Sequence, residues 1–248
     1  MTQIAYQLYC SRNFPPLAET LQMLSDVGIS AVEGYGALLD DPTELKSALA
    51  SSGLTMPSCH VGLDLLESDP DGTIALLGEL GVKKAYVPYL AAEDRPVNSD
   101  GWQAFADRLV VAGKPLREAG FVYGWHNHDF EFVTTPEGDL PMDIIASADP
   151  GLLLELDLGW VQRAGHDPLA TIAKYAGKIA TAHIKDVAPE GDCADEDGWA
   201  DVGHGVIDWS AIHATLKDAG VDHYVIEHDN PKDHQRFASR SFATLQSL

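Results

Sequence analysis

The sequence of 248 residues predicts a single (β/α)₈ barrel that spans residues 1–248. Short apolar, β-rich segments alternate along the whole chain with longer segments of helical periodicity. Several helical segments end in a glycine just before the next apolar segment, and eight apolar segments of this kind are present. Since each strand is followed by a crossover, the strands run parallel, and eight parallel units close most naturally as a barrel.

The predicted strands are Ile4–Leu8, Ala31–Gly34, Thr55–Val61, Lys84–Pro88, Phe121–His126, Leu152–Asp157, Ile179–Ile184 and Tyr224–His228. The predicted helices are Pro15–Val27, Pro42–Ser51, Gly72–Leu80, Trp102–Ala119, Leu169–Tyr175, Trp209–Ala219 and His234–Gln246. In the first helix, Leu17, Leu21 and Leu24 follow the i, i+4, i+7 spacing of a buried stripe.

The glycines that end helices favour the left-handed C-cap conformation, and they are Gly28, Gly53, Gly81, Gly120 and Gly220. A doubly wound open sheet is the alternative architecture. However, no GxGxxG follows the first predicted strand and no GxxxxGK[ST] occurs anywhere, so the nucleotide-binding motifs typical of that alternative are missing.

Composition and charge exclude several classes of partner. The formal net charge of −22 disfavours binding to nucleic acid or to anionic membranes, because the surface repels phosphate groups. No run of eighteen apolar residues indicates a membrane span, and no secretory signal is visible at the N-terminus. The scattered Cys10, Cys59 and Cys193 fit free thiols, so we expect a cytoplasmic protein.

The longest irregular stretch is Val187–Gly205, which is rich in Asp, Glu and Gly. Long loops in compact domains are often functional, so this segment is a candidate lid.

Ionisable side chains cluster at the ends of the predicted strands, where barrel enzymes carry their chemistry. In order along the chain they are Glu33, His60, Tyr86, His126-Asn127-His128, Asp157, His183 with Lys185, and Glu227 with His228. A single residue of this kind is usually a hydrogen-bonded core or loop residue. Their recurrence in the second half of the chain indicates a shared site.

Asp157, His183, Glu227 and one group from the fifth strand form a mixed oxygen and nitrogen donor set. Such a set suits one divalent metal ion: we expect Mn²⁺ first, with Mg²⁺, Co²⁺ or Zn²⁺ as alternatives. A metal so placed can polarise a carbonyl group while a neighbouring side chain moves the proton next to it.

Five segments, WHNHDFEF, LELDLGWVQRAGHDP, AHIKD, GHGVIDW and VIEHDNP, resemble the xylose-isomerase-like TIM-barrel superfamily. Within it the chain looks most like the sugar phosphate isomerase/epimerase group. This resemblance implies that Asp157, His183 and Glu227 are metal ligands. The fifth-strand ligand is typically a glutamate in epimerases of this type, whereas here His126 stands at the matching place and Glu131 is the alternative. A histidine at this place is similar to the keto-inositol dehydratase branch.

The same resemblance suggests Glu227, His126, Lys185 and Glu131 as catalytic groups. Substrate contacts are expected from side chains near the barrel mouth, namely Glu33, His60, His128, Trp160 and Trp125. Each has a structural alternative: a core or capping histidine, an ion pair of Lys185 with a nearby acid, or a tryptophan packed in the core. His166, His213, His223 and His234 are expected to be ordinary surface residues, and Asp208 a helix cap.

The leading hypothesis for function is a divalent-metal-dependent isomerase or epimerase of a small sugar or keto-sugar, which abstracts a proton next to a metal-bound carbonyl. The alternative is a keto-sugar or keto-inositol dehydratase or lyase of the same superfamily. A non-catalytic sugar-binding barrel and a metal-dependent endonuclease are weaker alternatives, because the metal set is intact and Trp160 replaces a histidine that the endonuclease site needs. We expect a non-phosphorylated substrate, and the resemblance alone implies a homodimer.

Overall fold

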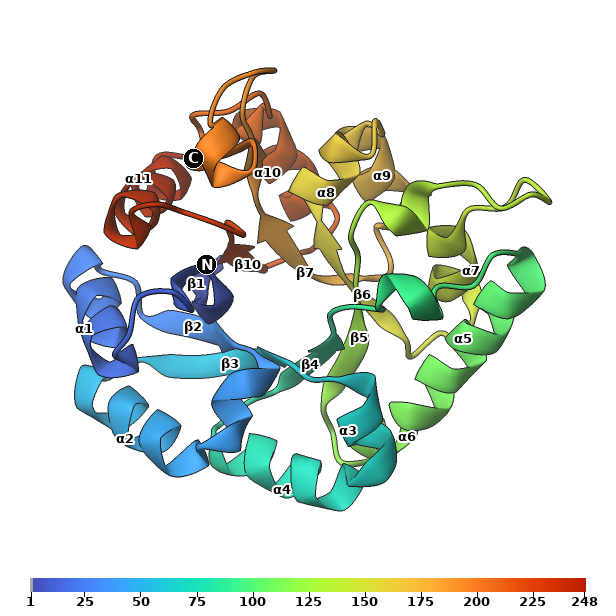
Figure 1. Ribbon diagram of the computed structural model, residues 1–248, viewed down its shortest axis with the longest axis horizontal. Coiled ribbons are helices and arrows are strands. Elements are labelled where there is room, and N and C mark those ends of the chain that lie inside the picture. Colours follow the sequence, from blue (N-terminus) through green and yellow to red (C-terminus); the bar gives the residue numbers. More distant parts are fainter. Residues whose placement is uncertain (1) are drawn as a thin grey trace.

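The computed structural model describes residues 2–248, so only Met1 of the predicted domain lies outside it. Within this range eight parallel strands form a closed barrel in the order β1-β10-β7-β6-β5-β4-β3-β2. Helices surround the strands on the outside (Figure 1). The predicted (β/α)₈ barrel is therefore confirmed.

The barrel strands lie close to their predicted positions: β1 (Gln3–Gln7), β2 (Ala31–Gly34), β3 (Thr55–His60), β4 (Lys84–Val87), β5 (Val122–His126), β6 (Leu153–Asp157), β7 (Ile179–Ile184) and β10 (His223–Ile226). The register pairs His126 with Glu155 and Asp157 with His183 across neighbouring strands. Because all the strands are parallel, the side chains at their C-terminal ends meet at one end of the barrel.

The helices are α1 (Leu17–Val27), α2 (Pro42–Ser52), α3 (Leu63–Ser68), α4 (Pro70–Glu79), α5 (Ser99–Ala112), α6 (Lys114–Glu118), α7 (Pro141–Ser147), α8 (Leu158–Arg163), α9 (Pro168–Tyr175), α10 (Trp209–Asp218) and α11 (His234–Gln246). The predicted helix 102–119 is divided at Gly113, where any side chain would collide with the ring of Tyr123. The predicted C-cap glycines are confirmed: Gly28, for example, has a φ of 98° and donates its N–H to the last turn of α1.

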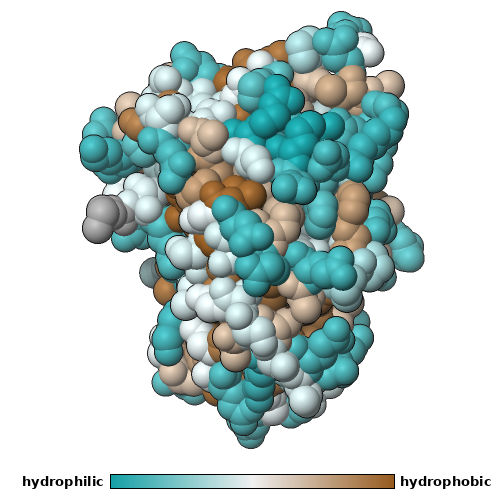
Figure 2. Space-filling model, turned by 90° about the vertical axis from the view of Figure 1, so that its left-hand side faces the viewer, coloured by the Kyte–Doolittle hydropathy of each residue, from teal (hydrophilic) through white to brown (hydrophobic). Residues whose placement is uncertain are grey.

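The large apolar core lies between the barrel and its helices, and α1 contributes Leu21 and Leu24 to it. The outer face that includes α1 and α11 is mostly hydrophilic, with smaller apolar areas between (Figure 2). This is the pattern of helices that bury one face. Across residues 2–248, none of the helices is both long enough and apolar enough to cross a membrane.

The inside of the barrel is largely polar. Within it Tyr86 and Thr181 share a hydrogen bond of 2.8 Å, and the Ser58 hydroxyl lies 3.4 Å from Nε2 of His223. His223 is 2% exposed, which corrects its assignment as a surface residue. The prediction failed because His223 is the first residue of β10 and faces inward, whereas it was taken for part of a loop.

The long segment after β7 is held in place by hydrogen bonds and ion pairs. The antiparallel strands β8 (Asp186–Val187) and β9 (Trp199–Ala200) form its base. The buried Asp186 carboxylate accepts five hydrogen bonds, from the backbone N–H groups of residues 187, 203, 205 and 207 and from Nε1 of Trp209. Arg236 of α11 also binds Glu196 and Asp201 of the segment. None of the cavity-lining residues among 2–248 comes from this segment, so it does not cover the cavity in this structure.

Candidate metal centre

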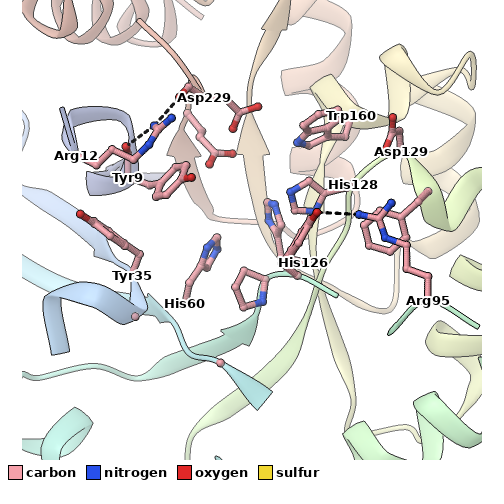
Figure 3. A pocket seen from close by; sticks show the side chains of 16 residues that line it. Tyr9, Arg12, Tyr35, His60, Arg95, His126, His128, Asp129, Trp160 and Asp229 are labelled. Carbon is pink, nitrogen blue, oxygen red and sulfur yellow. Dashed lines mark hydrogen bonds between the residues drawn. The ribbon is translucent and has the colours of Figure 1, made fainter. Parts of the chain in front are cut away.

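A cavity of about 720 Å³ opens at the C-terminal end of the barrel. Figure 3 shows the imidazoles of His60, His126 and His128 and the indole of Trp160 around it. These side chains come from the ends of β3 and β5 and from the first turns after β5 and β6. Of the predicted substrate-contacting residues, the structure therefore brings His60, His128 and Trp160 to the cavity, together with Glu227.

At the floor of this cavity, His126, Asp157, His183 and Glu227 converge. One donor atom from each lies within 4.8 Å of the others, and all four side chains are buried. The reason lies in the strand order, since β5, β6, β7 and β10 are consecutive around the barrel. The amide of Asn127 strengthens this arrangement, because it accepts the N–H of Asp157 at 2.9 Å and donates to the carbonyl of the same residue at 3.2 Å.

The donor set fits a divalent cation. Asp157 Oδ2 and His126 Nδ1 are buried without a hydrogen-bond partner within residues 2–248. Burial lowers the pKa of His126 to about 4, so its imidazole is neutral and can offer a lone pair. Burial raises the pKa of Asp157 to about 8, because a carboxylate here lacks solvent and sufficient compensating charge. A divalent ion would supply that charge and accept both lone pairs.

Lys185 lies behind this centre rather than in the cavity. Its side chain is fully buried, and Nζ lies 2.8 Å from Asp229 Oδ2 and 3.4 Å from Glu227 Oε2. The ammonium group also lies over the ring of Trp199, 4.3 Å from the centroid. Lys185 was expected to be a catalytic group, with an ion pair to a nearby acid as the alternative; the structure shows the ion pair, and Lys185 does not line the cavity. It orients and neutralises carboxylates of the centre instead.

Trp125 and Glu131 point away from the metal cluster. Nε1 of Trp125 donates to Glu131 Oε1 at 2.7 Å, and the indole packs against Phe105 of α5. The other oxygen of Glu131 accepts the N–H of His128 at 3.0 Å. Burial raises the pKa of Glu131 to about 8. The structure thus puts Trp125 in the core behind the barrel wall instead of against a sugar, and leaves Glu131 outside the four-residue cluster.

Glu33, predicted to contact substrate, lies below the cavity and is 0% exposed. Its Oε1 accepts the amide N–H of Gln7 at 2.9 Å and lies 2.7 Å from Nε2 of His183. Glu33 does lie near the end of its strand, as predicted, but its side chain points into the barrel and other side chains cover it. This corrects the predicted substrate contact.

Glu155 is a further buried carboxylate of this region that was not among the predicted site residues. This residue precedes Asp157 by two positions on β6, so both side chains face the same side of the strand, inside the barrel. Its Oε2 lies 2.5 Å from Nε2 of His60 and 3.2 Å from Nε2 of His183. The alternation in LELD could have revealed it. Although burial opposes it, the charges of Glu33 and Glu155 raise the pKa of His60 to about 9.

Loop residues also reach the cavity rim, and of these Arg95 was the one that the sequence had marked as a possible phosphate-binding residue. Arg12 and Tyr9 follow β1, Tyr35 follows β2, and Arg95 follows β4 (Figure 3). Arg12 lies over the ring of Tyr9, and Arg95 lies over the ring of Phe130, 3.7 Å from its centroid. Rim residues of this kind carry no periodic sequence signal, because only the folded loops bring them to the cavity.

Residues 21–246 match the model of the family described as xylose isomerase-like TIM barrel. This chain belongs to that family. An inosose dehydratase of Geobacillus kaustophilus (strain HTA426) is 26% identical over 192 residues, which is 68% of this chain and 61% of that protein. The chain therefore spans about three-fifths of the length of this curated relative.

Solved structures with the same fold include a sugar phosphate isomerase/epimerase from Parabacteroides distasonis ATCC 8503. It has a TM-score of 0.84 and 21% identity over 100% of this chain and 94% of its own. The IOLI protein with a binding zinc atom has a TM-score of 0.78 and 17% identity over 100% of this chain and 97% of its own. At these identities the likeness establishes the fold, and the buried donor cluster independently indicates a divalent metal.

Proposed function

We propose that this chain is a divalent-metal-dependent enzyme that removes a proton next to the ketone of a small keto-sugar or keto-cyclitol and then expels water. The observation that carries this proposal is the donor set at the cavity floor, in which the fifth strand supplies the neutral imidazole of His126 rather than a carboxylate. Glu227 is then the ligand carboxylate that reaches the cavity wall. The likeness to inosose dehydratases supports the same reaction class.

When bound, the cation would polarise the ketone and stabilise the negative charge of the enediolate. Glu227 takes the proton as the C–H bond breaks, and the electron pair moves into the enediolate. The hydroxyl group on the adjacent carbon then leaves with its bonding pair. It takes a proton from His60 on the opposite wall, whose pKa of about 9 keeps the imidazole protonated, and departs as water.

Isomerisation or epimerisation is the second candidate, because acid and base groups face the cavity from two sides. Glu227 follows β10 and His60 ends β3, and these strands are far apart in the barrel order. A proton removed by one group could return from the other side, with mass conserved. The resemblance to the Parabacteroides distasonis isomerase/epimerase fold favours this alternative.

The test is to incubate protein loaded with Mn²⁺ with keto-inositols and keto-sugars in D₂O, and to follow the products by mass spectrometry and proton NMR. Dehydration gives a product lighter by one water, whereas epimerisation gives unchanged carbon and oxygen content with deuterium at the carbon next to the ketone. Metal-free protein is the control. Metal-loaded protein that gave neither deuterium exchange nor water loss with any of these ketones would contradict the proposal.

A further inference from the structure

Beneath the metal centre lies a second set of polar side chains, Gln7, Glu33, His60 and Glu155, which we call the lower layer. Glu33 and Glu155 are each 0% exposed, and neither lines the cavity formed within residues 2–248. They therefore have no direct access to a substrate. Two buried carboxylates are costly unless hydrogen-bond donors or cations compensate them, so the lower layer needs its own explanation.

His183 lies between the lower layer and the metal centre. Its Nδ1 is 2.8 Å from Glu227 Oε2 and 3.9 Å from Asp157 Oδ2, above. Its Nε2 is 2.7 Å from Glu33 Oε1 and 3.2 Å from Glu155 Oε2, below. An imidazole that binds a metal is neutral, with one N–H and one lone pair, so only one of the two sides of His183 can then receive the lone pair.

The hydrogen bonds of the lower layer show whether the lone pair of His183 faces the metal centre above or the carboxylates below. The backbone N–H of Tyr9 can only donate, and it points at Gln7 Oε1 at 3.0 Å. Gln7 Nε2 must then be the donor to Glu33 Oε1, so Glu33 is an acceptor in this contact. Carboxylates accept and do not donate when they are ionised. The Nε2 of His183 is consequently the atom that carries the proton.

We propose that Glu33 and Glu155 are positioning residues: they hold the Nε2 proton of His183, so that this histidine binds the metal through Nδ1. The inference rests on the proposed metal centre. A carboxylate that accepts the second N–H of a metal-binding histidine fixes its orientation and makes it a better ligand. The arrangement also explains why carboxylates that never reach the cavity lie directly below it.

A second cation in the lower layer is the competing arrangement, because donor atoms of His60, His126, Glu155 and His183 also lie within 4.8 Å of one another. It would require Nε2 of His183 as a ligand, without its proton. The two arrangements therefore differ in metal stoichiometry and in the nitrogen that binds.

The first experiment measures Mn²⁺ binding to the wild type, Glu33→Gln, Glu155→Gln and the double variant by competition with a chelating dye. We expect one equivalent of metal in the wild type. The Kd should rise about tenfold in each single variant and up to about a hundredfold in the double variant. Saturating Mn²⁺ should restore full metal occupancy in each variant, because the four ligands remain. Tyr86→Phe is the matched control, since it removes the buried hydrogen bond to Thr181 inside the barrel and leaves both carboxylates of the lower layer in place.

The second experiment locates the proton by long-range ¹H–¹⁵N NMR of the Zn²⁺-loaded protein. Nε2 of His183 should show the shift of a protonated nitrogen and Nδ1 that of a metal-bound one. The opposite pattern, unchanged Kd values in the double variant, or two equivalents of metal of which Glu155→Gln loses one would each overturn the inference. Since neither experiment uses a substrate, a metal-binding protein without dehydratase or epimerase activity would refute only the proposed function.

Discussion

Asp157 and Asp186 are both fully buried aspartates near the same end of the barrel, yet their surroundings differ. Asp186, which follows β7, accepts five hydrogen bonds from backbone and indole N–H groups. Asp157, at the end of β6, accepts one from the N–H of Trp160 at 2.8 Å, and its Oδ2 lacks a partner within residues 2–248. The first carboxylate is compensated by the protein itself, whereas the second is left for a cation.

Burial alone therefore does not mark a functional carboxylate. A buried acid whose oxygens are all bonded stabilises the fold, because its desolvation is offset by charge-assisted hydrogen bonds. A buried acid with a free oxygen destabilises the fold unless a ligand binds there. Asp186 therefore belongs to the architecture of the loop 187–208, and Asp157 belongs to the metal centre.

The largest effect should come from Asp157→Asn. We expect turnover of a responsive keto-sugar or keto-inositol to fall by about a thousandfold or more, because the cation that stabilises the transition-state charge is lost. Metal analysis should show depleted metal. The free energy of unfolding, measured with a chelator present, should not decrease, since the amide replaces a carboxyl group whose pKa burial raises to about 8 and whose Oδ2 lacks a hydrogen-bond partner within residues 2–248. Full metal content in this variant would show that Asp157 is not a metal ligand and would contradict the proposed difference between the two aspartates.

Asp186→Asn should have the opposite profile. The asparagine keeps one acceptor oxygen and turns an amide N–H₂ toward N–H groups, so several donors lose their partner. We expect the free energy of unfolding to fall by about 3 kcal/mol in urea titrations. The folded fraction should still bind one equivalent of Mn²⁺. A variant as stable as the wild type would show that the five hydrogen bonds contribute little.

The smallest effect should come from Glu196→Gln. The pH dependence of this effect tests whether a buried carboxylate that accepts hydrogen bonds, as Asp186 does, stabilises the fold. Burial alone would raise the pKa of Glu196, but hydrogen bonds from the Lys232 N–H and the Arg236 guanidinium hold it below its ordinary value. A depressed carboxyl pKa stabilises the fold fully above the unfolded-state pKa of about 4.3, and this stabilisation is lost as the pH falls through the folded-state pKa.

The difference in unfolding free energy between the wild type and Glu196→Gln should therefore be about 2 kcal/mol at pH 7 and should shrink below about pH 4. Chelator-containing buffers keep the metal centre out of the measurement. A difference that grew as the pH fell would mean that the carboxylate is not stabilised in the folded protein.

Much of the site was predictable because parallel strands place their last residues together. The spacing of strand ends was enough to propose Asp157, His183, Glu227 and one fifth-strand group, and the family resemblance favoured His126 over Glu131 as that group. The structure places these four residues within reach of one cation. Glu155 was also within reach of the same reasoning, since it shares a strand face with Asp157. The sequence did not predict which of the side chains at the strand ends are accessible from the cavity. Glu33 and Lys185 stand at the mouth by sequence, but their neighbours enclose them.

By itself the sequence determined the barrel, the family resemblance and the residues at the strand ends, because periodicity and glycine caps are local properties of the chain. Only the tertiary structure decided which of those residues face the cavity, which nitrogen of His183 faces the carboxylates below it, and that the loop after β7 is anchored by Asp186. The physical reason is that accessibility and hydrogen-bond direction depend on groups distant in sequence, which adjoin only after the barrel closes.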